Sequence, residues 1–179
     1  LDPALMRVGF VFLLVGYGTK AGLAPMHTWL PDAHSQAPAP VSAIFSGFLL
    51  NTALYCIVRC LPLVDGAPGN AGWPGGLLSF VGLVSIVVAA AFILFQSNVK
   101  RLLAYSSVEH IGIIALGLGL GGPGVFAALF HTLNHSIGKT LAFVSAGRLG
   151  QIYGTHDMRR LAGAARAAPV WGAGFAGSL

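Results

Sequence analysis

Three titratable side chains lie on one stripe of an apolar segment, FHTLNHSIGKTLAF at residues 130–143. His131, His135 and Lys139 follow one another at steps of four residues, and such a step rotates a helix by only about 40°. Histidine changes charge near neutral pH, and a lysine held away from water can release its proton, so this row can bind and pass protons. A metal site would need further ligands, and none appears at suitable spacing. The spacing therefore predicts a proton relay.

Other polar groups inside apolar runs are candidates for the same chemistry, because an ionisable group in a bilayer costs roughly 2.5 to 3.5 kcal/mol. Glu109 and His110 are adjacent and point about 100° apart on a helix. They either face a polar cavity or pair between helices. Asn51 can orient water or bridge two helices. In the stretch PDAH, Asp32 and His34 either gate one end of the path or cap a half helix.

The composition is that of a membrane protein. Hydrophobic residues make up 55% of the 179 and charged residues only 8%, whereas a soluble domain has about 25% charged residues. The ten Lys and Arg residues are scattered rather than clustered, which argues against a nucleic-acid partner. Cys56 and Cys60 lie four residues apart with no further cysteine to complete a metal site, so we expect them to be packing residues.

The apolar runs predict a series of spanning helices, each needing about 20 residues. They cover residues 8–23, 41–63, 77–96, 102–120 and 125–149, and another begins at 170. The runs are long and lack period-two alternation, so a closed barrel fits poorly. Glycines within them, such as Gly112, Gly117 and Gly119, indicate close helix packing. The predicted fold class is all-α, a polytopic transmembrane helix bundle forming a single domain, 1–179.

One helix in this bundle is predicted to be broken. Four prolines stand between residues 25 and 40, and a regular helix cannot pass through them. Lys20 comes just before the break. Unwound backbone at membrane depth is tolerated only inside protein or beside water, so Lys20 joins the candidate relay residues.

The positive charges predict the orientation. Six Lys and Arg residues fall on one side of the threaded spans (Lys100, Arg101, Arg148, Arg159, Arg160 and Arg166), whereas only Arg7 and Arg59 fall near the other. By the positive-inside rule, segments 25–40, 97–101 and 148–168 then face the cytoplasm of a cell with an inner (plasma) membrane. On this evidence alone, Lys100 and Arg101 are ambiguous between relay residues and membrane anchors.

Three stretches, KAGLAPMHTWLPDAHSQAPAPVSA, NVKRLLAYSSVEHIG and FHTLNHSIGKTLAFVSAG, give the chain a family resemblance. It resembles the antiporter-like membrane subunits of respiratory complex I, Mrp antiporters and membrane-bound hydrogenases. Members of that family have about fourteen spans of bilayer length, so the chain resembles a fragment running from the seventh span to the start of the twelfth. The glutamate partner of the seventh span and the helices after the twelfth would lie outside it.

The resemblance also implies roles for residues. Lys20 corresponds to the lysine of the broken helix, Lys100 to the lysine that opens the tenth span, and the stripe His131, His135 and Lys139 to the central relay. Asn51 stands where some complex I subunits carry a lysine. The pair Glu109-His110 and the run GYGTK are more similar to the hydrogenase-4 and formate hydrogenlyase branch.

The leading hypothesis is therefore a proton-translocating subunit of a hydrogenase-4 or complex I-like (NADH:quinone oxidoreductase-related) redox complex. Charge would pass from Lys20 through Lys100 and the histidines to Lys139. Electron transfer would occur in partner subunits that carry hydrogenase, iron–sulfur or quinone-reducing centres, since the chain has neither a cysteine set for a cluster nor a nucleotide loop; no cofactor is expected in this chain. The alternatives are an Mrp-type antiporter subunit that exchanges sodium for protons, and a non-functional structural fragment.

Overall fold

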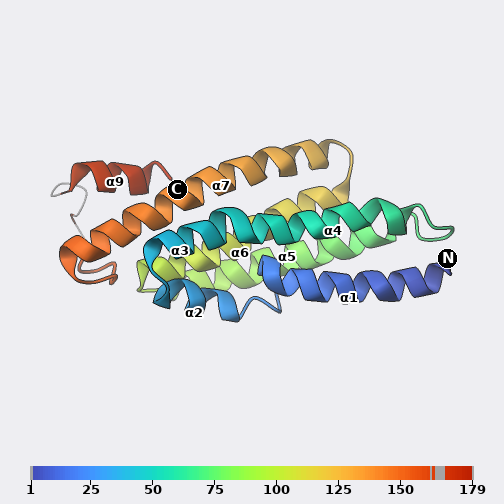
Figure 1. The fold of residues 1–179 in the computed structure, drawn as a ribbon, viewed down its shortest axis with the longest axis horizontal. Helices are drawn as coiled ribbons and strands as arrows, with labels where there is room; N and C mark the ends of the chain where they lie inside the picture. Colours follow the sequence, from blue (N-terminus) through green and yellow to red (C-terminus); the bar gives the residue numbers. More distant parts are fainter. Residues whose placement is uncertain (1, 162, 164–167, 179) are drawn as a thin grey trace.

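The long helices run side by side along one axis and form a single bundle (Figure 1). This computed structural model describes residues 2–161, 163 and 168–178. In chain order the helices are α1 (Pro3–Ala21), α2 (Trp29–Gln36), α3 (Ala39–Ile44), the π-helix η1 (Phe45–Leu49), α4 (Leu50–Asp65), α5 (Trp73–Ile93), α6 (Val99–Leu120), α7 (Pro123–Tyr153) and α9 (Pro169–Ala176). The described residues contain no strand, which confirms the predicted all-α fold class.

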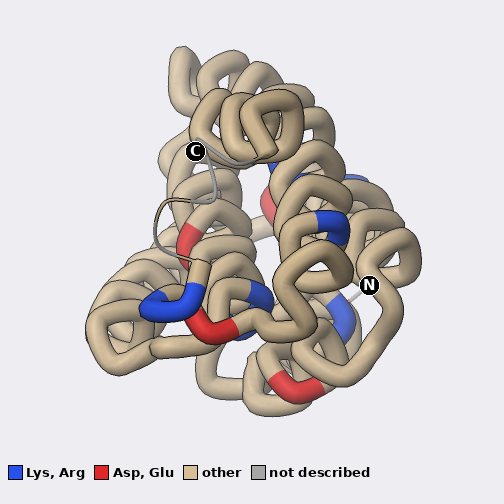
Figure 2. The backbone as a smooth tube through the Cα atoms, turned by 90° about the vertical axis from the view of Figure 1, so that its left-hand side faces the viewer, with Lys and Arg blue, Asp and Glu red and all other residues tan. Residues whose placement is uncertain are grey.

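Four helical segments are long and apolar enough to cross a membrane: Pro3–Ala21, Ala39–Asp65, Trp73–Ile93 and Val99–Leu120. Viewed end on, the backbone carries few charged residues (Figure 2). Helix α7, with 31 residues, is the longest described helix but is not one of the four. Its interior holds the polar stripe of His131, His135 and Lys139, which lowers its hydropathy.

Several helices begin earlier than their apolar runs predict, and capping side chains extend two of them, α1 and α6. Helix α1 starts at Pro3 rather than near residue 8, since the Asp2 carboxylate accepts a hydrogen bond from Ala4 N at 2.9 Å. Helix α5 starts at Trp73, whereas the predicted span begins at residue 77. Helix α6 starts at Val99. The side-chain oxygen of Asn98 caps it by accepting hydrogen bonds from the backbone N–H groups of Lys100 and Arg101. Lys100 therefore lies inside the first turn of a helix.

The proline-rich segment breaks a helix, as predicted. Helix α1 ends at Gly22, whose φ of 77° lies in the left-handed region that favours glycine. A turn leads to α2, and a second break at Pro38 separates α2 from α3. The Trp29 indole N–H donates to the carbonyl oxygen of Thr19 at 2.7 Å. This bond ties the start of α2 to the last turn of α1, beside Lys20.

Helix α6 lies at the centre of the bundle, packed against α5, α7 and α2. The segments predicted to be cytoplasmic meet at one end of it: α2 contacts the start of α6, and the chain after α7 pairs with residues 97–99. At the opposite end, Arg7 donates to Asn70 Oδ1 at 2.5 Å. The loops thus lie at two ends of the bundle, and the loops predicted to be cytoplasmic share one end. Which end faces the cytoplasm stays a prediction. Arg166 lies outside the described residues.

Candidate functional site

The stripe on α7 faces α6, and its two deepest members are almost fully buried. His135 is 3% exposed and Lys139 is 4% exposed, whereas His131 is half-buried. The Lys139 ammonium donates a hydrogen bond to Ser106 Oγ on α6. A charged group this far from water is expensive unless a polar neighbour compensates it, and Ser106 is such a neighbour.

Three imidazoles meet next to this lysine. His110 Nδ1 on α6 and His131 Nε2 on α7 share a hydrogen bond of 2.8 Å, and their rings are stacked with centroids 5.0 Å apart. The ring of His135 lies 5.5 Å from that of His110. Only one of the two nitrogens in the short bond can carry the hydrogen at a time. Passing a proton between His110 and His131 therefore needs no movement of either helix.

A second wall of the site comes from the π-helix and α4. The Asn51 amide Nδ2 donates to Ser136 Oγ at 2.7 Å and lies 3.4 Å from His135 Nδ1. It also donates to the carbonyl oxygen of Gly47 at 3.1 Å, which belongs to η1. π-helical turns are frequent at functional sites. Asn51 thus bridges two helices, one of the two roles that the sequence left open, and contacts His135.

The polar atoms around His135 are incompletely paired. Within the described residues, His135 Nε2 and Asn51 Oδ1 are buried without a hydrogen-bond partner. A buried polar atom left unpaired costs about 1 to 3 kcal/mol, so this part of the site carries a cost that the contacts among the described residues do not offset.

Lys100 is buried, with 4% of its surface exposed, and does not reach into water as an anchor would. Its ammonium donates to the carbonyl oxygens of Ser35 at 3.2 Å and Ala37 at 2.5 Å. These carbonyls belong to the end of α2, where a helix leaves its carbonyl groups unpaired and carries partial negative charge. Lys100 therefore binds the broken helix through its charge.

His34 is near enough to both Lys100 and Lys139 for their positive charges to act on it. It is fully buried, and its ring stacks on Phe143 with centroids 4.8 Å apart. Phe143 is one turn beyond Lys139 on α7, while the next residue after His34, Ser35, accepts the bond from Lys100. Within the described part of the chain neither ring nitrogen of His34 has a hydrogen-bond partner.

The order of the groups along the path differs from the predicted one. The sequence placed the histidines of α7 between Lys100 and Lys139. Because α6 and α7 form an antiparallel pair, Ser106 meets Lys139 and His110 meets His131. Lys139 therefore lies in the middle, with Lys100 and His34 toward one end of the bundle and the three imidazoles toward the other.

Two of the predicted relay residues are not brought into this cluster. Lys20 lies exposed in the last turn of α1, on the outer surface of the bundle. Glu109 is half-buried, three residues after Ser106 on α6, and forms no ion pair within 4.0 Å among the described residues. The structure does not connect Lys20 to Lys100 through side chains; the link it provides is α2, bound at one end by Trp29 and at the other by Lys100.

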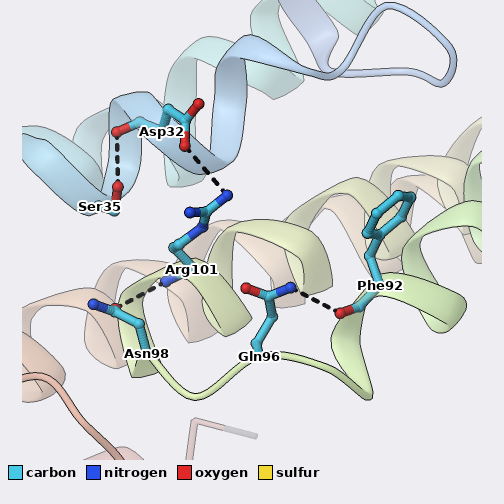
Figure 3. A network of polar contacts seen from close by, with 6 residues as sticks. All are labelled: Asp32, Ser35, Phe92, Gln96, Asn98 and Arg101. Carbon is cyan, nitrogen blue, oxygen red and sulfur yellow. Dashed lines mark hydrogen bonds and ion pairs between the residues drawn. The ribbon is translucent and has the colours of Figure 1, made fainter.

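Asp32 ties α2 to α6 from the outside. Its carboxylate lies 3.3 Å from the guanidinium of Arg101, and both side chains are well exposed, at 72% and 42% (Figure 3). Exposed ion pairs contribute little, because water screens them and ordering two side chains costs entropy. This agrees with Arg101 as a surface group and sets it apart from its neighbour Lys100.

We therefore expect a small coupling between Asp32 and Arg101, below about 1 kcal/mol. A double-mutant cycle with Asp32→Ala and Arg101→Ala, read by thermal unfolding of the detergent-solubilised full-length protein, measures it. A coupling of several times that size would mean that this pair, and not Lys100, holds the end of α2.

Sequence reasoning missed two polar residues of the site. Ser106 lies four residues before His110, so helical spacing could have placed it on the same face. Ser136, next to His135 on α7, had no such signal, because only the fold brings it to Asn51, whose amide donates to its Oγ at 2.7 Å. Metal ligation gains no support: within the described residues no group of three or more His, Cys, Asp and Glu side chains is placed to hold an ion.

The fold and the buried Lys and His groups define a class of membrane protein, and comparison with known sequences gives its family. Residues 2–176 match the family described as NADH:quinone oxidoreductase/Mrp antiporter, TM. The chain belongs to this family, which confirms the resemblance inferred from its three motifs.

The relatives include membrane subunits of hydrogenases. The chain is 46% identical to hydrogenase-4 component F homolog of Methylacidiphilum infernorum, over 98% of this chain and 37% of that protein. It is 36% identical to formate hydrogenlyase subunit 3 of Escherichia coli, over 88% of this chain and 27% of that protein. The chain thus spans less than two-fifths of the length of these relatives. The hydrogenase branch predicted from Glu109-His110 is among the proteins that it resembles.

Solved structures share the arrangement of helices. A chain of the membrane-bound sulfane sulfur reductase, an archaeal respiratory membrane complex, superposes with a TM-score of 0.82 at 37% identity, over 89% of this chain and 33% of that one. A chain of the Mrp complex from Dietzia sp. superposes with a TM-score of 0.75 at 28% identity, over 84% and 28%. Both are parts of larger membrane assemblies, as expected for a subunit of this family.

Proposed function

We propose that this chain carries the central proton path of a membrane subunit in a hydrogenase-type or complex I-like redox complex. The observation that supports it most is Lys139, buried on Ser106 at the junction of α6 and α7, with three imidazoles on one side and His34 on the other. In the part of the path between α6 and α7, His110 and His131 share a hydrogen bond, and His135 lies one helical turn from Lys139.

The path runs along the α6–α7 interface. Lys100 lies near the end where the loops carry positive charge, and His34 links it to Lys139. From Lys139, protons pass to His135 and to the pair His110–His131. A charge at one buried lysine acts strongly on the next because little water screens it. Adding a proton at Lys100 therefore favours its release from Lys139 toward the imidazoles.

Coupling to electron transfer is proposed to enter through partner subunits and Lys20. Lys20 is exposed on the surface of this part of the protein, where another membrane helix can supply an acidic partner. A change in that pairing reaches Lys100 through α2, since α2 is bound to the last turn of α1 and to the Lys100 ammonium. In this proposal the subunit lies in the inner membrane, with Lys100 near the cytoplasmic side.

A second candidate is an antiporter subunit of the Mrp type, favoured by the superposition on the Mrp complex. The same buried lysine could then release protons against a sodium or potassium ion rather than against electron flow. The two functions predict different driving forces for one proton path.

The experiment uses inside-out membrane vesicles that contain the full-length subunit with its partner subunits. Formate, hydrogen and NADH are supplied in turn, and a pH-sensitive dye reports acidification of the vesicle lumen. We expect acidification with one of these donors, abolished by an uncoupler. Proton flux driven by a pulse of sodium or potassium without a donor would favour the antiporter, and electron transfer without any proton movement would contradict both.

A further inference from the structure

The chain beyond α7 folds back onto the start of α6. The backbone N–H of Val99 donates to the carbonyl oxygen of His156 at 2.9 Å, and that of Met158 donates to the carbonyl oxygen of Ser97 at 2.9 Å. Between these two bonds, Asn98 and Asp157 form an isolated antiparallel bridge. This pairing fixes His156 beside the residue that precedes Lys100.

The ring of His156 occupies a space that a glycine leaves open. A side-chain carbon added at Gly150, in the last turns of α7, would overlap with the imidazole of His156. The ring is half-buried in this position, and its Nδ1 atom is buried without a hydrogen-bond partner in the described part of the chain. The imidazole therefore packs against Gly150 of α7, and its Nδ1 edge is buried.

Among the described residues, the charged groups near His156 make their contacts elsewhere. On α6, the positive charge of Lys100 is near enough to act on His156. On α7, Arg148 is exposed and donates to Gln151 Oε1. In its own segment, the Asp157 carboxylate accepts from the backbone N–H of Arg159 at 2.9 Å. On α2, Asp32 is paired with Arg101.

Burial, and to a smaller extent the positive charge of Lys100, lower the pKa of His156 below its usual value of about 6.5. A positive charge on Lys100 thus favours the neutral form of the imidazole. It binds a proton more readily once Lys100 has lost its own. A group that supplies protons to Lys100 must alternate between these two states, the neutral and the protonated imidazole.

We propose that His156 exchanges protons between water at this end of the bundle and Lys100. The inference rests on the proposed function, since it assigns the group that loads the first buried lysine of the path. In the loading step the neutral imidazole takes a proton from hydronium, leaving water. The imidazolium N–H bond then breaks as the proton passes to the neutral Lys100 amine, where a new N–H bond forms. No oxidant or reductant takes part.

The test compares His156→Gln and His156→Ala with wild type in the same vesicles, using the donor that drives proton uptake. We expect either variant to lower the rate of proton uptake about tenfold, with the complex still assembled on native gels. Imidazole added to the medium should restore uptake in His156→Ala, because a diffusible base can replace the missing ring. Asp157→Asn is the matched control in the same segment, and should keep the wild-type rate.

The remaining outcomes either overturn the proposal for His156 or distinguish it from the proposed function. Wild-type uptake and pH profile in both His156 variants would overturn it, and so would a loss of uptake in assembled complex that imidazole does not restore. Loss of assembly in both variants would assign His156 to packing alone, which also contradicts it. Lys139→Ala, in contrast, should lose uptake without rescue by imidazole; if it pumps normally, the proposed function itself is wrong.

Discussion

Replacing Lys139 with alanine is expected to abolish proton translocation by the complex while leaving the complex assembled. The ammonium of Lys139 is the central group of the proposed path, with His34 toward one end and the three imidazoles toward the other. Alanine leaves Ser106 without its donor and removes the proton carrier between the two halves. Loss of one proton-transfer group commonly costs about 10² to 10⁴ in rate, so we expect uptake to fall at least about a hundredfold.

A second substitution at this position separates charge from proton exchange. Lys139→Arg keeps a positive charge, but a guanidinium cannot release its proton in a protein. We therefore expect Lys139→Arg to be as inactive as Lys139→Ala, measured as donor-driven lumen acidification in the vesicles. Arg148→Gln, which removes an exposed cation from the same helix, is the control and should pump at the wild-type rate. Normal pumping by Lys139→Arg would show that only the charge at this position matters.

The stripe on α7 could be predicted because it depends on local geometry alone. His131, His135 and Lys139 recur every four residues, and any helix through them places them on one face. Their partners could not be predicted in the same way. The bond between His110 and His131 depends on how far α6 and α7 are rotated and shifted against each other, and that is decided by packing across the whole interface.

The helix boundaries show which local signals were undervalued. Asp2 and Asn98 both cap helices, but hydropathy gives little weight to a polar residue that precedes an apolar run. For Lys100 this mattered, because a lysine in the first turn of a buried helix points along the bundle, whereas one in a loop would reach into water. Its burial on the end of α2 required the fold, since α2 lies some sixty residues earlier in the chain.

The order of the relay groups was predicted wrongly for a topological reason. Two glycines, Gly121 and Gly122, both with positive φ, join α6 to α7 in a tight turn. Two helices joined in this way run antiparallel, so residues early in α6 lie opposite residues late in α7. The turn was visible in the sequence as GGPG, and applying it to the site residues would have placed Lys139 between Lys100 and the histidines.

The packing of α5 against α6 decides where the site residues on α6 point. Glycines from both helices meet at this crossing, as the glycine-rich runs predicted. A side-chain carbon at Gly82 would lie 2.7 Å from the carbonyl oxygen of Gly112, and one at Gly112 would lie 2.8 Å from that of Gly82. Gly75 and Gly119 repeat the contact farther along the same helices. Small residues at such positions let two backbones touch, and here they hold α6 with Ser106 and His110 turned toward α7.

Replacing Gly112 with leucine is therefore expected to disrupt the bundle itself. The obstructing atoms are backbone, which cannot rotate away, so α5 and α6 must separate; overpacking of this kind costs about 3 kcal/mol or more. We expect a clear loss of the assembled complex on native gels and a lower thermal unfolding midpoint in detergent. Gly76→Leu, on α5 where an added side-chain carbon meets nothing within 4 Å, is the matched control. Normal stability in Gly112→Leu would mean that the two helices are not in contact at this glycine. Because Lys139→Ala should spare assembly and Gly112→Leu should destroy it, the pair of variants separates the chemistry of the path from the packing that aligns it.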